Sequence, residues 1–180
     1  GGKPLPPVKL PPVAAVNGMV PLDGDDILYR SQTYIEPPAW YHYLASTGES
    51  RTTALVKTSP ADYSDCEVVR EVATSKDGTK IPINIIHQKG IKLDGNNPTV
   101  VWGYGGFGVS ETPAFSPRRR VFIEQGGVFA MAVIRGGGEF GEAWHRAGNL
   151  TQKQNGFDDF YAACQHMIDA KYTRREKLAL

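Results

Sequence analysis

Hydrophobic and polar residues alternate along two neighbouring segments, residues 67–75 and 80–88, which are separated by Asp77-Gly78. Alternation with a period of two is typical of a strand that buries one face, and Asp-Gly is a strong signal for a tight hairpin turn. The apolar positions of the second segment are Ile81, Ile83 and Ile85. The pattern predicts an antiparallel hairpin whose isoleucines share one face.

Short apolar runs predict two further strands. Thr99–Trp102 is rich in β-branched residues, and Val128–Ile134 is continuously apolar, as in strands that are buried on both faces. Between them, Ser116–Gln125 has a helical pattern that stops at Gly126-Gly127. This order of strand, loop, helix and strand favours an α/β fold with a central, mostly parallel sheet and flanking helices.

The clearest helical pattern covers residues 157–171. Its apolar residues recur at helical spacing and form one stripe, consisting of Phe157, Phe160, Tyr161, Cys164, Met167 and Ile168. Asp158 and Asp159 are expected in the first turn, where the helix dipole favours anions. We expect this helix to pack against the sheet, and Lys177–Leu180 to begin another buried strand.

Residues 1–58 have a different composition, rich in proline, with short aromatic or β-branched runs such as Ile27–Ile35 and Trp40–Leu44. Such runs predict two or three antiparallel strands that belong to a larger array of sheets. The change in composition near residue 60 therefore predicts two segments, residues 1–58 and residues 59–180.

Composition and charge exclude several classes of partner. The 180 residues carry 20 Lys and Arg against 19 Asp and Glu, so we expect no nucleic-acid partner, and the longest apolar run, Val128–Ile134, is too short for a membrane span. Cys66 and Cys164 favour two reduced thiols. His42, His87 and His166 lack metal-ligand spacing, so we expect no metal and no cofactor. A cytoplasmic location is expected, and a periplasmic one stays open if a signal peptide precedes this sequence.

The stretch Trp102–Gly108, with the sequence WGYGGFG, directly follows a predicted strand. A glycine-rich loop with one aromatic hydroxyl at the end of a strand is how a hydrolase presents groups that stabilise an oxyanion. A G-x-S-x-G nucleophile turn does not occur in these 180 residues, so they cannot hold a complete catalytic triad. The pattern indicates part of an enzyme.

A second glycine pattern allows an alternative. Gly136, Gly138 and Gly141 form G-x-G-x-x-G after a strand, which would suit a nucleotide-binding module. Residues 144–148 separate these glycines from the next predicted helix, which argues against that function. We therefore favour a rigid structural loop over residues 135–148, in which His145 has a structural role.

Several blocks of the sequence resemble the prolyl oligopeptidase family in the family's order. They cover much of residues 65–180 and are Ser75–Pro82, Lys89–Gly95, the WGYGGFG loop, Arg135–Gly141, Trp144-His145 and Lys153–Phe160. Residues 1–58 are similar only in position and character to the last part of that family's β-propeller. The resemblance implies the first half of an α/β-hydrolase domain that is preceded by propeller strands.

The resemblance also implies a function. Members are serine peptidases that hydrolyse short peptides on the carboxyl side of proline, so short proline-containing peptides are the expected partners of a monomeric longer protein. Tyr104 matches the tyrosine of the oxyanion hole, and Phe107 matches an aromatic wall of the proline pocket. Because the triad would lie beyond Leu180, this chain alone is expected to be inactive, and a non-catalytic interaction fragment is the remaining alternative.

Overall fold

The computed structural model describes residues 7–180, which form two compact units. The first unit holds the described residues up to Asp62 together with Pro113–Pro117, and the second holds Tyr63–Thr112 and Arg118–Leu180. None of the helices in the described part of the chain has the length and apolar character needed to cross a membrane.

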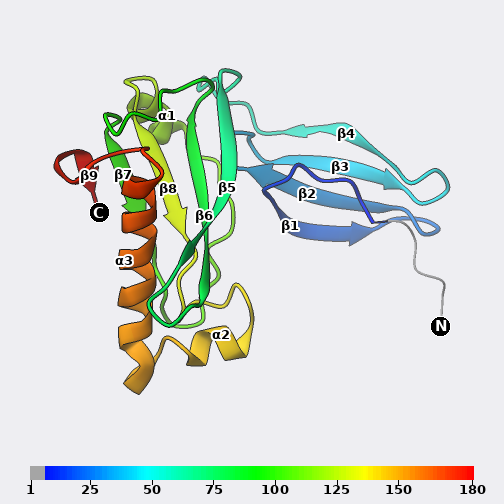
Figure 1. Cartoon of the computed structure of the whole chain (residues 1–180). Coiled ribbons are helices and arrows are strands. Elements are labelled where there is room, and N and C mark those ends of the chain that lie inside the picture. The colour runs from blue at the N-terminus through cyan, green and yellow to red at the C-terminus, as the bar shows by residue number, and fades with distance from the viewer. Residues whose placement is uncertain (1–6) are drawn as a thin grey trace. The chain divides into compact units, whose positions relative to one another are not determined.

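The first unit is an antiparallel meander of four strands, in the order β1-β2-β3-β4 (Figure 1). The strands are β1 (Ala14–Pro21), β2 (Ile27–Thr33), β3 (Ala39–Leu44) and β4 (Glu49–Val56). The runs predicted at 27–35 and 40–44 form the two inner strands. The expectation of two or three strands is wrong, because the two edge strands expose most of both faces and so lack an alternating pattern.

The second unit is built on a five-stranded sheet in the order β5-β6-β8-β7-β9. The strands are β5 (Cys66–Thr74), β6 (Lys80–Gln88), β7 (Thr99–Trp102), β8 (Val128–Ala132) and β9 (Leu178–Ala179). The predicted hairpin is confirmed, since β5 pairs with β6 in antiparallel register from Cys66–Gln88 to Thr74–Lys80. The β6–β8 pair is also antiparallel, whereas β7 runs parallel to both β8 and β9, so the sheet is mixed.

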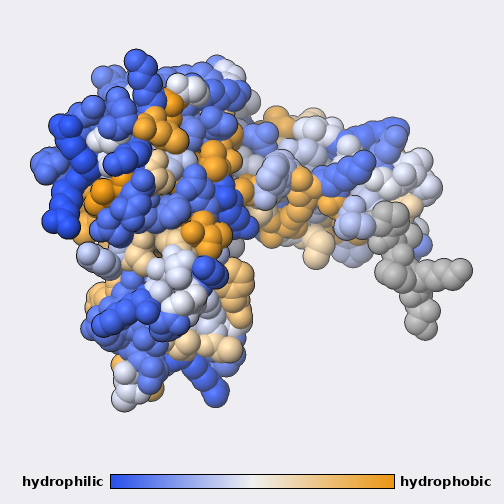
Figure 2. Space-filling model, viewed as in Figure 1, coloured by the Kyte–Doolittle hydropathy of each residue, from blue (hydrophilic) through white to orange (hydrophobic). Residues whose placement is uncertain are grey.

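The core of the second unit lies between this sheet and the long helix α3 (Lys153–Asp169), which runs along the sheet in Figure 1. Ile81, Ile83 and Ile85 are fully buried there, as the alternating pattern predicts. Figure 2 shows that the surface of this unit is mainly hydrophilic, with scattered hydrophobic patches. The apolar side chains of the sheet are therefore removed from water on the face that α3 covers.

The buried face of α3 differs from the predicted stripe. Its buried residues are Gly156, Asp159, Ala163, Cys164 and Met167, whereas Phe157 and Tyr161 are exposed. Small residues decide this orientation, because a Cβ at Gly156 would lie 3.1 Å from the Arg135 carbonyl oxygen and the helix can approach closely only on this side. The helix also begins at Lys153, four residues earlier than expected, so Asp159 is not in its first turn.

Three other expectations need adjustment. The predicted helix at 116–125 forms as α1 (Pro117–Ile123), but the region 135–148 contains a short helix, α2 (Glu142–Arg146), and is not entirely loop. The single-turn 3₁₀ helices η1 (Leu150–Gln152) and η2 (Arg175–Lys177) flank α3. The strand expected to be buried at 177–180 forms as β9, yet Ala179 and Leu180 are exposed, so its burial was wrongly predicted.

Candidate active-site loop

The glycine-rich segment 103–108 leaves β7 at its carboxyl end, and β7 lies between β8 and β9 in the sheet. Gly103 begins the loop in a confined place, because a Cβ there would lie 3.1 Å from both the Ala132 carbonyl oxygen and the Phe160 ring. A larger residue would push β7 away from β8 and α3. The sequence therefore places the loop at the edge of a parallel pair of strands, where α/β proteins present functional groups.

The loop is packed, backbone against backbone, on the segment that follows β8. Gly105 has φ +57°, and a Cβ there would lie 2.5 Å from Ile134 Cγ1 and 2.8 Å from the Arg135 carbonyl oxygen. A Cβ at Gly136 would in turn overlap the Gly105 carbonyl oxygen. Gly108 N–H donates a hydrogen bond of 3.1 Å to the Gly136 carbonyl oxygen. Glycine is required at positions 105 and 136 because any side chain there would separate the two segments.

Tyr104 stands on the accessible side of this loop. Its side chain is 42% exposed, and its ring stacks on Trp102 with 6.5 Å between the centroids and 9° between the planes. The phenol ring also lies against Gly106, where a Cβ would be 3.9 Å from the hydroxyl oxygen. The hydroxyl group has no hydrogen-bond partner among residues 7–180, so it can donate to a ligand.

Phe107 is the most exposed large apolar residue of the loop, with 90% of its surface accessible. Its φ of +53° is unusual for a residue with a side chain. No described residue covers the ring, so the described chain does not form an aromatic pocket around it. Strained backbone of this kind occurs at ligand sites more often than elsewhere, which makes the position a candidate contact for an apolar group.

The segment after β8 is held by a buried ion pair that the sequence patterns did not reveal. The Arg135 side chain is 6% exposed and that of Asp159 is fully buried; the carboxylate accepts bonds of 2.9 Å from Nε and 2.6 Å from Nη2. Ser75 Oγ donates to the same carboxylate at 2.6 Å, and Arg135 Nη1 donates to Asp77 at 2.6 Å. The Arg135 guanidinium, together with hydrogen bonds from Thr79, holds the pKa of Asp77 well below its ordinary value.

His145 has the structural role that the sequence favours. Its Nδ1 donates a hydrogen bond of 2.7 Å to the Gly136 carbonyl oxygen, while Nε2 accepts one of 3.0 Å from the Asn149 side chain. Both ring nitrogens are therefore engaged in holding the segment 136–149. This arrangement fixes the carbonyl oxygen that also binds Gly108.

The nucleotide-binding alternative does not fit this geometry. The predicted separation of these glycines from the next helix is wrong, since α2 begins directly after Gly141. The decisive observation is that Gly136 and Gly138 face the carbonyl oxygens of Gly105 and Gly108, so backbone fills the space that a pyrophosphate would need. Within residues 7–180 there is also no cluster of three His, Cys, Asp or Glu side chains that could hold a metal ion.

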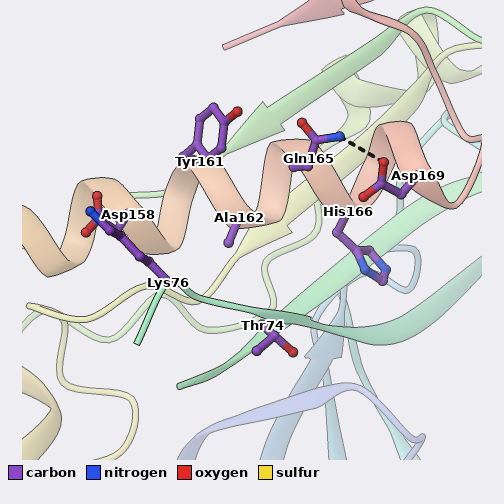
Figure 3. A pocket seen from close by; sticks show the side chains of 8 residues that line it. All are labelled: Thr74, Lys76, Asp158, Tyr161, Ala162, Gln165, His166 and Asp169. Carbon is purple, nitrogen blue, oxygen red and sulfur yellow. Dashed lines mark hydrogen bonds between the residues drawn. The ribbon is translucent and has the colours of Figure 1, made fainter. Parts of the chain in front are cut away.

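A separate pocket of about 430 Å³ lies between α3 and the end of β5 (Figure 3). Its lining includes both signs of charge and comprises Thr74, Lys76, Asp158, Tyr161, Ala162, Gln165, His166 and Asp169. His166 Nε2 donates a hydrogen bond of 2.6 Å to Glu71, which also accepts a hydrogen bond of 2.6 Å from Tyr172. None of the residues 102–108 lines this pocket, so it is distinct from the glycine-rich loop.

Both cysteines, Cys66 and Cys164, are free and buried. Burial, together with the hydrogen bond to the neighbouring Asp65 carboxylate, raises the pKa of Cys66 to about 11. Burial also raises the pKa of Cys164. Neither thiol is therefore an ionised nucleophile at neutral pH.

Comparison with curated proteins gives relatives over nearly the whole chain. The chain is 42% identical over 182 residues to a prolyl endopeptidase of Elizabethkingia meningoseptica, covering 99% of this chain and 25% of that protein. A dual-function macrocyclase-peptidase of Galerina marginata is 45% identical over 131 residues, which cover 72% of this chain and 18% of that protein. The chain thus spans about a quarter or less of the length of these relatives.

Solved structures give the same result for the fold. A prolyl endopeptidase structure superposes with a TM-score of 0.87 at 42% identity, covering 98% of this chain and 26% of that chain. Prolyl oligopeptidase B of Galerina marginata, bound to a 35-residue substrate, has a TM-score of 0.80 at 35% identity over 92% of this chain and 24% of its own. The second unit is accordingly part of an α/β-hydrolase domain, and the first is a sheet of the β-propeller type.

The sequence profile of the Prolyl oligopeptidase family matches residues 113–180. The relatives above extend the similarity through the first unit as well as the second. They are peptide-hydrolysing enzymes, and one has been solved with a peptide substrate bound. This chain therefore belongs to the prolyl oligopeptidase family.

Proposed function

We propose that the longer protein to which this sequence belongs is a serine-type oligopeptidase that hydrolyses short peptides on the carboxyl side of proline. The observation that carries the proposal is the 42% identity over 182 residues to a prolyl endopeptidase, which includes the whole glycine-rich loop region. These 180 residues contain no G-x-S-x-G nucleophile turn. Their contribution is to the binding of the substrate and of the reacting oxygen.

Tyr104 is assigned the role of an oxyanion-hole donor. Its hydroxyl is accessible and has no hydrogen-bond partner among residues 7–180, so it can donate a hydrogen bond to the negative oxygen of a tetrahedral intermediate. Because the charge on that oxygen develops only during reaction, the bond strengthens in the transition state. Tyr104 therefore supports turnover more than the binding of substrate.

Phe107 is assigned to the wall that contacts the proline ring of the substrate. Its ring is exposed on the same loop as Tyr104, three residues further along the chain. A flat aromatic face suits the flat apolar pyrrolidine ring of proline. The remaining walls of such a pocket belong to parts of the longer protein outside these 180 residues.

The test is the substitution Tyr104→Phe in the longer protein, with release from a proline-containing chromogenic peptide as the assay. We expect kcat to fall by about 100-fold or more while KM changes little, since only a transition-state donor is lost. Tyr161→Phe, which alters an exposed tyrosine of α3, is the matched control and should retain turnover. Comparable kcat for wild type and Tyr104→Phe would refute the assignment.

A further inference from the structure

One lysine contacts the backbone of the glycine-rich loop directly. Lys153 is the first residue of α3, and its Nζ donates a hydrogen bond of 2.7 Å to the carbonyl oxygen of Gly105, the residue that follows Tyr104. Among residues 7–180 this oxygen has no other hydrogen-bond donor. The contact joins the helix and the loop across 48 positions of sequence.

The loop needs such an anchor because its glycine-rich backbone can adopt many conformations. Glycine occupies four of the positions 103–108, and Gly105 has the positive φ that glycine adopts without cost. Hydrogen bonds from the backbone of Gly108 and Val109 hold the far end of the loop, beyond Phe107. On the side of Tyr104, the polar anchor is Lys153.

The position of Lys153 is otherwise unfavourable for a cation. The amino-terminal end of a helix carries partial positive charge, which disfavours a lysine at the first residue. Lys153 forms no salt bridge within the described chain, and its other charge contact is with the face of the Phe157 ring, 5.7 Å from the centroid. A residue that is unfavourable for the local structure in this way occurs mainly at functional sites.

From these contacts we infer that Lys153 is a positioning residue for Tyr104, an inference that rests on the proposed function of that tyrosine. The peptide unit between Gly105 and Gly106 is planar, so fixing its carbonyl oxygen also fixes the orientation of Gly106. The Tyr104 ring lies directly against Gly106, at 3.5 Å from a Cβ built there. A charge-assisted bond to one end of this peptide therefore limits where the phenol can lie.

The test uses the longer protein with three substitutions. Lys153→Met removes the donor and keeps the length of the side chain, Lys153→Arg keeps a donor, and Lys92→Met is a control for the loss of one exposed positive charge. We expect Lys153→Met to lower kcat by about 10- to 100-fold with KM changed by less than about twofold, since small displacements of a catalytic group have effects of this size. Lys153→Arg should recover most of the activity, and Lys92→Met should equal wild type.

A double variant separates positioning from a general structural effect. In the Tyr104→Phe background, Lys153→Met should change kcat by less than about twofold, because the group that it positions is already lost. An equal loss in both backgrounds, or wild-type kcat for Lys153→Met, would overturn the inference.

Amide hydrogen exchange supplies a readout that does not depend on activity. Lys153→Met should speed exchange across residues 104–109 by about tenfold or more, while the amides of α3 keep their protection. Unchanged exchange in the loop overturns the inference, whatever Tyr104→Phe does. Full turnover by Tyr104→Phe overturns the proposed function instead, whatever exchange shows, so the two failures are distinguishable.

Discussion

The Asp159 carboxylate accepts three hydrogen bonds from Arg135: from the backbone N–H at 3.0 Å, from Nε at 2.9 Å and from Nη2 at 2.6 Å. This pair joins the middle of α3 to the segment that follows β8, where Arg135 lies three residues beyond the end of the strand. Asp77 extends the same network to the turn of the β5–β6 hairpin. Three elements distant in sequence are thereby held around one guanidinium.

The substitution Asp159→Asn should strongly destabilise the second unit. The Arg135 guanidinium would stay charged and buried while losing its main counter-charge, and breaking a buried ion pair on one side costs about 3–5 kcal/mol. The free energy of unfolding in urea measures this loss. A decrease below about 1 kcal/mol would show that Asp77 and Ser75 alone satisfy the guanidinium.

Glu142→Gln is the matched control for that substitution. Glu142 also pairs with an arginine, at 2.7 Å from Arg146 Nε, but both side chains are largely exposed. Exposed pairs contribute little to stability because water and salt screen them. Urea denaturation of this variant should be indistinguishable from that of wild type.

The stability of the chain should fall in acid partly through Asp77. The hydrogen bond from Arg135 lowers the pKa of Asp77 below its ordinary value of 3.8 in the folded state, so the unfolded chain takes up the proton first as pH decreases. The stabilisation is therefore complete above about pH 4 and is lost at lower pH.

Asp77→Asn should reduce the slope of the unfolding free energy against pH below about pH 4. The comparison variant is Asp94→Asn, which changes an exposed aspartate that accepts a hydrogen bond from the backbone N–H of Asn96. The slope for Asp77→Asn should fall below that of this comparison variant. Equal slopes for Asp77→Asn and wild type would contradict a role for Asp77 in acid sensitivity.

Gly105→Ala should be more damaging than the same change at another glycine with positive φ. At Gly78, with φ +88°, no atom lies within 4 Å of a Cβ, so alanine there adds only backbone strain of about 1–2 kcal/mol. At Gly105 the Cβ would also meet Ile134 and the Arg135 carbonyl oxygen, which adds about 1–3 kcal/mol of overpacking. Thermal denaturation of the two variants measures the difference in stability. Equal melting temperatures would show that the loop accommodates the added methyl group without loss of stability.

The β5–β6 hairpin could be predicted because its signals are local. Asp77-Gly78 fixes the turn, and alternation over residues 80–86 fixes which face is buried, so pairing follows from neighbours in the chain. The edge strands β1 and β4 carried no such signal, since strands exposed on both faces have no apolar side to alternate with. The buried face of α3 was wrongly predicted because its packing depends on Gly156. This residue has no side chain, so the helix can lie close to the Arg135 carbonyl oxygen on that face.

Some residues of the candidate site could likewise be predicted from the sequence, and others could not. Tyr104 and Phe107 could be nominated because they belong to a contiguous motif, and the structure places both on the accessible side of one loop. Arg135, Asp159 and Lys153 could not, since the partners of each contact are 24 to 48 residues apart and no periodic pattern links them. A buried aspartate on a helix face otherwise made of small and apolar residues is the signal that could have suggested an ion pair.

Taken alone, the sequence determined which segments form strands and helices near a turn or a strong apolar run, and it determined the family through the order of its motifs. Local hydrogen bonding and hydrophobic periodicity act between close neighbours, so a linear pattern records them. Only the tertiary structure decided how Gly105, Gly136 and Gly156 let three backbones meet, and which charges hold them there. Those contacts depend on excluded volume and on burial away from water, which exist only once distant segments have been brought together.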